Sequence, residues 1–492
     1  MKPGTQLRLA VGDLDGEGAG VAVLPASPGQ PAFEVRVAGT LPGETVTARI
    51  EHVSTHRALA WATLQTIETP AVTRVTPACA AYGRCGGCVL QHFDYPAQVA
   101  WKEHALRALC ATQPALEGVP VLPAVASPAP LGYRNKSKLV VALQPGAPPA
   151  GMEHLVLGAY APRSHQVVDL AGCAIAQPPL DDVAAALRDL LVEHRVEPYD
   201  ERRLTGTLRY VILRASAAGE VLAVLVTAND AFPAGAAVAA ALRARRPEVR
   251  GVVQNINPSR GNALFGSSEI TLAGDRTLPD RIGDVRLCVS PQAFFQANRA
   301  VAALAYRAIV EALAPRSSDV VVDAYAGVGG IALGLAPRVA RVIGIEEHPG
   351  AVEDAAVSAA WNGVVNATFV AGDVADRLAA VGRADLVVLN PPRKGCAPAV
   401  LDQAANLGPR AIAYLSCNPE TLLRDLALLH QRGYRARGIT PFDMLPHTPH
   451  LEALAILDRL DRSGLAEDQV TPPEEEPAPT RPGSLALKGS PQ

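Results

Sequence analysis

The stretch VVVDAYAGVGGIALGLA, residues 320–336, decides the fold. An apolar run ends at Asp323, and Gly327, Gly329 and Gly330 lead from it into a second apolar run. Glycines at such a turn let the backbone approach a ligand closely, and the start of the following helix offers unpaired N–H groups. The stretch therefore predicts a strand, a ligand-binding turn and a helix.

Glu346 adds weight to this interpretation because it ends the next apolar run, 23 residues after Asp323. An acidic residue at about that interval accepts hydrogen bonds from ribose hydroxyls, so the pair favours an adenosine-containing cofactor over a turn without a ligand. The glycines do not follow the G-x-G-x-x-G spacing of dinucleotide sites. This departure favours S-adenosylmethionine, which has no pyrophosphate, over a nicotinamide dinucleotide.

Strand-like and helical segments alternate from about residue 300 onward. Runs rich in Val, Ile and Leu predict strands at 319–325, 341–347, 367–373, 384–392 and 411–417, with helical segments at 331–337, 350–363 and 420–433. Nearly continuous apolar strands separated by helices indicate an α/β fold with a parallel, doubly wound sheet of Rossmann type.

Two polar segments, LNPPRKG and LSCNPE, follow the fourth and fifth predicted strands. Ligands of doubly wound folds bind at this carboxyl edge of the sheet. Free cysteines are usually buried as small apolar residues. Cys417 in LSCNPE is nevertheless expected to face the cofactor crevice, where a thiol can act as a nucleophile.

The chain is predicted to contain three folded regions and a tail. Residues 1–67 hold short strand-like runs broken by Gly, Asp and Pro, which indicate a small antiparallel barrel or sandwich. Residues 68–289 mix strands and helices behind a cysteine-rich loop, and residues 290–462 form the doubly wound region. Residues 463–492 are rich in Pro, Glu, Ser and Gly, so we expect a disordered acidic tail.

The formal net charge is −3, and acids outnumber bases in the tail, so the folded part is close to neutral. Any surface that binds nucleic acid must therefore be local. No apolar run reaches the roughly 18 to 20 residues that span a bilayer, and the N-terminus lacks a signal-peptide core. We expect a cytoplasmic protein with no membrane partner.

Eight cysteines, unevenly spaced, do not form a disulfide framework in a chain of 492 residues. Cys79, Cys85 and Cys88 lie within ten residues on a glycine-rich loop, and Cys173 is a distant fourth thiol. Such a cluster favours a metal site over core packing, although its spacing does not distinguish zinc from an iron–sulfur cluster. Two other cysteines, Cys110 and Cys288, are expected in the core.

Together these segments resemble the bacterial RNA uracil-5-methyltransferases, which make 5-methyluridine in ribosomal and transfer RNA. The resemblance extends from about residue 6 to residue 460 and rests on CAAYGRCGGCVLQHFDYPAQVAWK, YRNKSKLV, VVQNINP, SPQAFFQANRA, DAYAGVGG, NPPRKG, LSCNPETLLRDL and DMLPHTPHLEALAIL. It implies an OB-like TRAM barrel that contacts RNA at the N-terminus. It also implies a 4Fe–4S cluster in the central region, with Cys173 as the fourth ligand.

The resemblance further implies a mechanism. Uracil C5 is too weak a nucleophile to take a methyl group from a sulfonium unaided, so the Cys417 thiolate is expected to add to C6. The resulting electron density on C5 then attacks the methyl group. Glu452, in HTPHLEAL, is expected to remove the C5 proton so that elimination releases the thiolate and the product.

Further residues carried over from the resemblance are expected to line the methyl-donor and uracil pocket: Gln296, Tyr325, Glu346, Asp373 and Asn390, with Gly327 and Gly329 shaping the turn. Asp373 has the strongest claim to being an ordinary loop residue. Asn390 stands where the family usually has aspartate; its amide can meet the N3–H and O4 of uracil, but a flipped amide also fits cytosine. Cys396 is a rival nucleophile that ranks below Cys417.

The leading prediction is an enzyme, expected to be a monomer, that methylates C5 of one uridine in RNA, with 23S ribosomal RNA as the expected substrate. Its alternatives are methylation of a transfer RNA uridine or of an RNA cytosine. An iron–sulfur oxidoreductase and a non-catalytic RNA-binding module are two further hypotheses.

Overall fold

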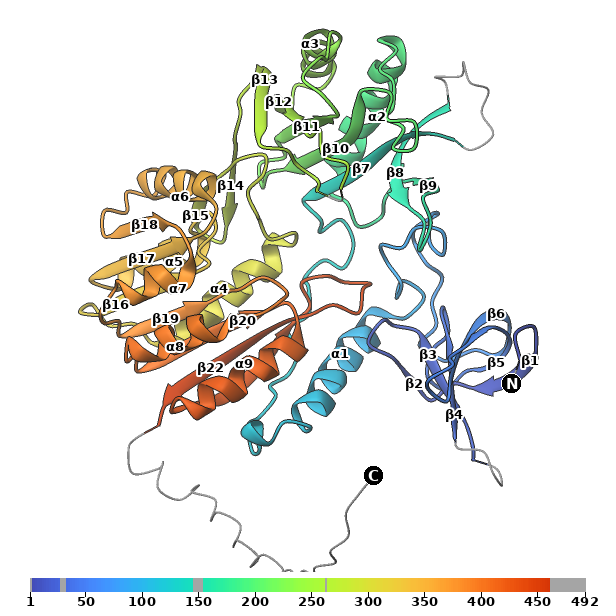
Figure 1. The fold of residues 1–492 in the computed structure, drawn as a ribbon, viewed down its shortest axis with the longest axis horizontal. Coiled ribbons are helices and arrows are strands. Elements are labelled where there is room, and N and C mark those ends of the chain that lie inside the picture. Colours follow the sequence, from blue (N-terminus) through green and yellow to red (C-terminus); the bar gives the residue numbers. More distant parts are fainter. Residues whose placement is uncertain (1, 27–31, 145–153, 262, 461–492) are drawn as a thin grey trace, which may run out of the picture. The chain divides into compact units, whose positions relative to one another are not determined.

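The computed structural model describes residues 2–26, 32–144, 154–261 and 263–460 (Figure 1). Residues Met1–Arg459 make up one compact unit. The predicted tail, residues 463–492, lies outside the described residues. No helix in the described ranges is long and apolar enough to cross a membrane.

The C-terminal region is built on a seven-stranded sheet. Its strands, in spatial order, are β18 (Ala367–Ala371), β17 (Arg341–Glu346), β16 (Val320–Ala324), β19 (Leu386–Leu389), β20 (Ala411–Ser416), β22 (Glu452–Arg459) and β21 (Tyr434–Phe442). The first five are parallel, and they are the five strands that the apolar runs predict. β22 then runs antiparallel to both β20 and β21, an ending that the sequence patterns did not predict.

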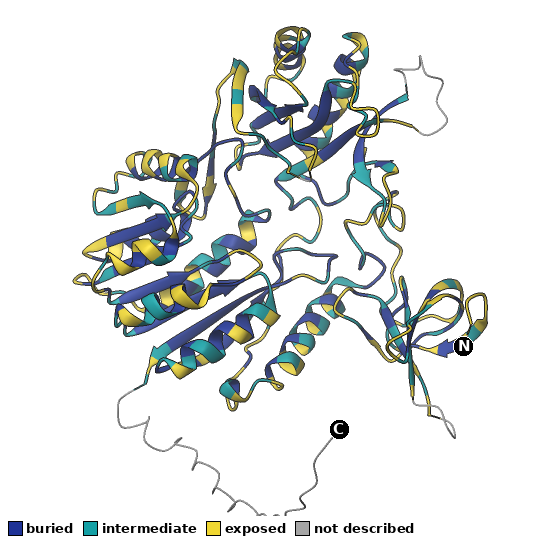
Figure 2. Cartoon of the chain, in the orientation of Figure 1, coloured by how far each residue is buried: buried dark blue, intermediate teal, exposed yellow. Residues whose placement is uncertain are grey.

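Helices cover both faces of this sheet, as a doubly wound fold requires. Alternate residues of β16 point to opposite cores: Val322 packs with α7, α8, α9 and α1, whereas Val321 packs with α4 and α5. Figure 2 shows the strands as dark, buried ribbons between helices with exposed outer faces. The bounds of these helices are α1 (Tyr95–Cys110), α4 (Arg299–Leu313), α5 (Gly330–Leu335), α6 (Pro349–Trp361), α7 (Val374–Ala379), α8 (Pro398–Asn406) and α9 (Pro419–Gln431).

Several helices begin at a polar side chain that caps the first turn. Asn298 accepts a hydrogen bond from the Val301 amide at the start of α4, and Asn418 accepts one from the Glu420 amide at the start of α9. Such caps satisfy amides that have no partner inside the helix. Because Asn418 directly follows Cys417, the cap of α9 fixes the backbone beside the predicted nucleophile.

The central region contains a second seven-stranded sheet and confirms the predicted mixture of strands and helices. Its order is β13 (Ser268–Gly274), β12 (Val249–Ile256), β11 (Val221–Thr227), β10 (Leu208–Ala215), β7 (Lys136–Leu143), β8 (Leu155–Tyr160) and β9 (Val167–Asp169). Helices α2 (Pro178–Glu193) and α3 (Gly235–Arg245) pack against one face. A hairpin of β14 (Leu278–Ile282) and β15 (Val285–Val289) then leads to α4.

The N-terminal region is a six-stranded sheet in the order β1 (Gln6–Ala10), β5 (Thr45–Val53), β6 (Leu59–Thr69), β4 (Phe33–Val37), β3 (Gly20–Leu24) and β2 (Asp13–Leu14). β1 and β2 are two halves of one strand, separated by residues 11 and 12. One half pairs with β5 and the other with β3, so the same segment completes both edges. Neighbouring strands are antiparallel, as predicted, except β4 and β6, which are parallel; the barrel or sandwich itself remains a prediction. The predicted domain boundaries themselves remain predictions.

Candidate functional site

Cys417 and Glu452 lie opposite each other at the ends of two neighbouring strands. β20 ends at Ser416, β22 begins at Glu452, and the antiparallel register pairs Ser416 with Ala453. Cys417 follows Ser416 and Glu452 precedes Ala453, so the same register places Cys417 opposite Glu452. Their electrostatic coupling reflects this proximity, since the Glu452 carboxylate contributes to raising the pKa of the Cys417 thiol.

Burial governs the acidity of Glu452. Its residue is 9% exposed, and this desolvation raises the pKa of its carboxyl group to about 8, against a weaker opposing effect of Arg393. A carboxyl group with a pKa near neutrality can exchange a proton under physiological conditions. The sequence did not predict this property, because it depends on what surrounds the start of β22.

The Cys417 thiol is half-buried, and burial raises its pKa, with a further contribution from Glu452. Arg393 opposes both effects and so favours the thiolate. The Arg393 carbonyl accepts hydrogen bonds from the side chains of Asn418 and Thr421, which tie it to the start of α9. Arg393 lies in the quoted NPPRKG segment but was missed as a functional residue.

Cys396, the rival nucleophile, is a core residue. It is 3% exposed within a large hydrophobic cluster, and its amide donates to the Asp425 carboxylate at 2.8 Å. Burial raises the pKa of its thiol to about 12, which disfavours the thiolate. The predicted core cysteines Cys110 and Cys288 are likewise buried.

The glycine turn after β16 is held by Glu346. Its carboxylate accepts hydrogen bonds from the amides of Gly327 and His348, both at 2.9 Å. Gly327 and Gly329 have positive φ angles of 56° and 87°, and a Cβ atom at Gly329 would come within 2.9 Å of the Phe369 ring. The turn thus needs glycine at position 329 both for its backbone conformation and for space.

Two of the predicted pocket residues have distinct backbone roles. Tyr325 has a φ angle of 66°, a left-handed conformation that is strained for a residue with a side chain. Asp373 caps α7 by accepting hydrogen bonds from the amides of Ala375 and Asp376. Its carboxylate therefore has a structural task at the start of α7.

Gln296 and Asn390 complete the predicted set. Gln296 is 4% exposed, and its carbonyl accepts a hydrogen bond from Asn135 at 2.8 Å. Beside it lies the buried hydroxyl of Tyr306, whose pKa is raised by burial, by Asp323 and by Glu452. Tyr306 thus lies near both the glycine turn and Glu452, a role that its helical position in α4 did not reveal. The Asn390 side chain makes no hydrogen bond within the described residues. The backbone N–H of Asn390 donates a hydrogen bond to the Ala324 carbonyl.

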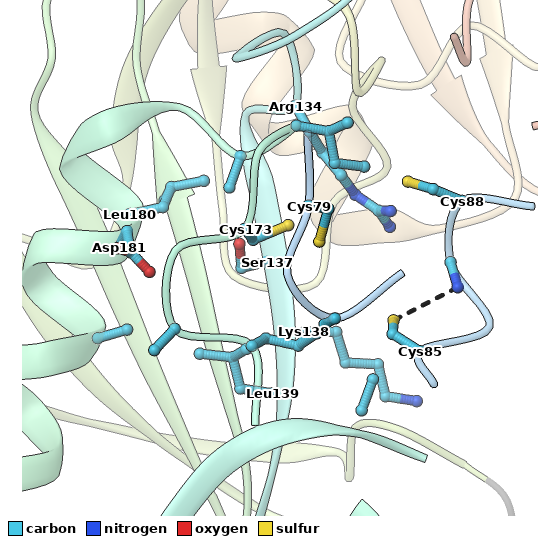
Figure 3. Close-up of a pocket in the computed structure, with 18 of the residues that line it drawn as sticks. Cys79, Cys85, Cys88, Arg134, Ser137, Lys138, Leu139, Cys173, Leu180 and Asp181 are labelled. Carbon is cyan, nitrogen blue, oxygen red and sulfur yellow. Dashed lines mark hydrogen bonds between the residues drawn. The ribbon is translucent and has the colours of Figure 1, made fainter. Parts of the chain in front are cut away.

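The four predicted metal-binding thiols, Cys79, Cys85, Cys88 and Cys173, line one cavity of about 360 Å³ (Figure 3). Burial raises the pKa of Cys85, and Cys79 and Cys173 add to this increase, so the thiols lie close enough to interact. Within the described ranges, no three His, Cys, Asp or Glu side chains are gathered closely enough to hold a single metal ion.

The loop that precedes Glu452, residues 443–451, is anchored to the segment that follows the cysteines. Lys102 in α1 forms an ion pair of 2.6 Å with Asp443, and both side chains are 2% exposed. Gln98 in α1 accepts a hydrogen bond from the His447 amide, and the Leu90 amide donates to the His447 carbonyl at 3.0 Å. The cysteine-bearing segment and the loop leading to Glu452 therefore share one buried polar network.

Comparisons with known proteins agree with this geometry. The family model described as tRNA (Uracil-5-)-methyltransferase matches residues 281–460. An RNA methyltransferase of Bacillus cereus is 34% identical over 455 residues, which cover 92% of this chain and 96% of that protein. One from Geobacter sulfurreducens is 37% identical over 462 residues, covering 93% and 90% of the two chains.

A solved structure extends the likeness to the fold of nearly the whole chain. The Pyrococcus abyssi tRNA (uracil-54, C5)-methyltransferase, in complex with S-adenosyl-L-homocysteine, superposes with a TM-score of 0.72 at 25% identity. The match covers 92% of this chain and all of that one. With the methyltransferase sheet, the glycine turn and these relatives in agreement, the chain belongs to the RNA uracil-5-methyltransferase family, whose members use S-adenosylmethionine.

Proposed function

We propose that this enzyme methylates C5 of a specific uridine in 23S ribosomal RNA, with Cys417 as the nucleophile and Glu452 as the base. The observation that carries this proposal is that the ends of β20 and β22 bring Cys417 and Glu452 next to each other, with Arg393 near enough to influence both. Neither residue needs to move far to act on the same pyrimidine ring, because C5 and C6 are bonded neighbours.

The proposed reaction runs in three steps. The Cys417 thiolate bonds to C6 of uracil, and the electrons of the C5–C6 double bond move towards C5 and O4. S-adenosylmethionine supplies the methyl group that C5 then takes up. Finally, the Glu452 carboxylate removes the C5 proton, the electrons of that bond restore the C5–C6 double bond, and the thiolate leaves.

The surroundings of the two residues support these roles. Arg393 favours the thiolate form of Cys417 that the first step requires. A pKa of about 8 makes Glu452 a stronger base than an exposed carboxylate and lets it hold the proton it receives. Gln296, Tyr325, Glu346, Asp373, Asn390 and the turn at Gly327 and Gly329 are the residues that we assign to the methyl-donor and uracil pocket.

We assign a 4Fe–4S cluster to the cavity between Cys79, Cys85, Cys88 and Cys173. Four thiolates are the usual ligands of such a cluster, and this cavity is lined by four thiols. Because the proposed chemistry transfers no electrons, we assign the cluster a structural role. It would stabilise the segment between the N-terminal sheet and α1. The closed six-stranded sheet of residues 6–69 is proposed to be an OB-like TRAM domain that contacts RNA.

A second candidate substrate is a uridine in transfer RNA. It is favoured by the Pyrococcus abyssi relative, which acts on uracil-54 of tRNA. Methylation of RNA cytosine is a third, because the free amide of Asn390 can present either its donor or its acceptor to the base. We propose that the enzyme acts as a monomer in the cytoplasm.

The nucleophile is tested by tritium release from RNA that carries 5-tritiated uridine. Cys417→Ala is expected to abolish release, whereas Cys396→Ala, which removes a thiol 3% exposed in the core, is the matched control and should retain it. Glu452→Gln should accumulate a covalent RNA adduct on denaturing gels. If Cys417→Ala still releases tritium and Cys396→Ala does not, the assignment of Cys417 as the nucleophile would be overturned.

The substrate is tested separately by mapping 5-methyluridine in total RNA from cells with and without the gene. A residue that loses its methyl group in large-subunit ribosomal RNA is the expected result. Loss confined to transfer RNA would replace the ribosomal proposal with the transfer RNA one, and loss of a 5-methylcytosine in cells without the gene would point to cytosine.

A further inference from the structure

The central sheet has two unlike faces. α2 and α3 cover one face and bury a cluster that includes Leu139, Val211 and Leu213. The hydrophobic cluster on the opposite face contains Val140, Tyr210 and residues from strands and loops, and no helix of the described chain contributes to it. This second face is therefore free of the helical layer that usually covers a sheet.

Two adjoining cavities hollow the second face at its β7–β8 end. Their volumes are about 1110 Å³ and 260 Å³, and they share the side chains of Tyr199, Glu201, Arg202 and Arg209 as a common wall. Pockets for small molecules usually measure about 300 to 1,000 Å³ and enclose their ligand. A hollow that is larger and divided by a common wall is better suited to a segment of polymer.

Aromatic rings and cations alternate from the wall of this hollow towards β7: Tyr199 and Arg209 line the hollow, whereas Tyr210 and Lys138 lie outside its lining, and Lys138 also lines the cysteine cavity. The Arg209 guanidinium lies 5.1 Å from the ring centre of Tyr199 and 5.7 Å from that of Tyr210, and Lys138 Nζ lies 5.0 Å from the ring of Tyr210. Arg209 is itself held by the carbonyl groups of Asn257 and Ser259. The tyrosines are thus fixed in position before any ligand binds, which limits the entropy lost on binding.

The cations nearest to the active site have no carboxylate partner. Lys136 and Lys138 form no ion pair with any described residue. Lys136 lies opposite Arg214 in the β7–β10 register, and burial together with the neighbouring cations lowers the pKa of Lys136 to about 7, so an anionic ligand would favour its charged form. The acids at the other end are occupied, because Glu201 lies 3.7 Å from Arg209 and Asp200 lies 3.8 Å from Arg203. In a chain with a net charge of −3, this is a local excess of positive charge.

The same face leads to the proposed pocket. Lys136 begins β7 directly after Asn135, whose side chain donates a hydrogen bond to the carbonyl of Gln296. A ligand on this face would therefore extend from the Gln296 loop, past the two lysines, to the tyrosines at the far end.

We propose that this surface, the basic aromatic face (Lys136, Lys138, Tyr199, Arg202, Arg209 and Tyr210), binds the single strand of RNA that flanks the target uridine. Phosphates would contact Lys136, Lys138 and Arg202, and a base would stack on Tyr199, whose other side is supported by Arg209. Basic grooves with aromatic platforms bind single strands in this way. The inference rests on the proposed function, and it adds a binding surface outside the catalytic pocket.

The experiment measures binding in the Cys417→Ala background, so that no methylation occurs during the titration. The probe is a fluorescein-labelled, unstructured 20-nucleotide RNA that contains uridine, and its anisotropy is followed at several salt concentrations. Lys138→Ala combined with Arg202→Ala should raise Kd about tenfold at low salt. The slope of log K against log salt should become shallower by about 1.4, as expected for two lost phosphate contacts.

Stacking is tested at Tyr199. Tyr199→Ala should raise Kd about tenfold, whereas Tyr199→Phe, which keeps the ring, should bind like the parent protein. A loss in both variants would assign the contact to the hydroxyl group and overturn the stacking proposal.

Arg341→Ala combined with Arg383→Ala is the matched control, since both residues are exposed and lie at the opposite, amino edge of the methyltransferase sheet. Titration with S-adenosylhomocysteine should give the same Kd for every variant, which shows that each one is folded. Equal RNA affinity in the Lys138/Arg202 variant and this control would overturn the proposal and point to a protein as the occupant. If the Lys138/Arg202 variant loses RNA affinity but mapping in cells finds no 5-methyluridine that depends on the gene, the binding face would be upheld and the proposed function contradicted.

Discussion

Arg393 lowers the pKa of both Cys417 and Glu452, and so it acts on the two proposed catalytic residues at once. Its own position is fixed through its carbonyl, which contacts α9, and through its guanidinium, which contacts the ring of His450. A single cation between a thiol and a carboxyl group favours the charged form of each. The effect of Arg393 on the reaction should therefore appear in the pH profile.

We expect Arg393→Met to shift the pH profile for formation of the covalent RNA adduct to higher pH, by about one unit, because the thiolate loses its nearby positive charge. Arg393→Lys should restore most of the original profile. The profile is measured by quench-flow with RNA and S-adenosylmethionine at saturation. An unchanged profile in Arg393→Met would show that the charge does not act on Cys417.

Glu452 also gives stability a pH dependence. A carboxyl group whose pKa rises from its usual value of 4.5 to about 8 on folding favours the folded state below pH 4.5, and this contribution is lost as pH rises through 8. Glu452→Gln removes the penalty of a buried charge. The variant should therefore exceed the parent in stability by on the order of 2 kcal/mol at pH 9 and match it near pH 4. Urea unfolding at both pH values measures the difference, and equal stability at pH 9 would contradict the raised pKa.

At the scale of elements, α1 holds the loop that leads to β22. The ion pair between Lys102 and Asp443 is buried, and Lys102 also donates to the Leu445 carbonyl. Removing one partner of a buried pair leaves an uncompensated charge, whereas replacing both by apolar groups is often neutral. The stabilities of the single and double variants should therefore differ sharply.

Lys102→Met is expected to reduce the free energy of unfolding by about 3 kcal/mol, because Asp443 stays buried without a partner. Lys102→Met combined with Asp443→Leu should recover most of that loss. Chemical denaturation followed by circular dichroism gives both values. If the double variant is less stable than the single one, the pair contributes net stability that apolar packing does not replace.

The elements also show which parts of the site could be predicted from the sequence. The parallel strands were predictable because each is a short, nearly continuous apolar run, and the position of Cys417 at the edge follows from the end of one of them. The proximity of Cys417 and Glu452 was not predictable, because it depends on β22 running antiparallel beside β20. The capping role of Asp373 could have been found from its place directly before the helical segment that begins at Val374. Tyr306 gave no signal, because an aromatic residue in a helix is usually part of the core.

At the scale of the whole molecule, the cysteine cavity and the catalytic loop belong to one network through Leu90, Gln98 and His447. The proposed cluster would fix the loop that bears three of its ligands. Its loss should therefore disturb residues that are distant from it in sequence, including the loop before Glu452.

Protein purified without oxygen should contain about four irons and four sulfides per chain. Cys173→Ala should lose most of the iron and melt at a lower temperature, while Cys110→Ala, which alters a buried cysteine outside the cavity, should keep its iron. Metal analysis and visible absorption measure cluster content independently of activity. Stoichiometric zinc in place of iron would contradict the cluster assignment.

The bond between Gln98 and His447 joins residues that are 349 positions apart. During synthesis at about 5 to 20 residues per second, α1 would leave the ribosome roughly 20 to 70 seconds before its partners. In that interval Lys102 has no Asp443 beside it. Cys417, which is made 35 residues before Glu452, also emerges before its neighbour. The proposed catalytic centre is therefore among the last parts of the protein to form, and a chain that stops short of residue 452 would carry the proposed nucleophile without its proposed base.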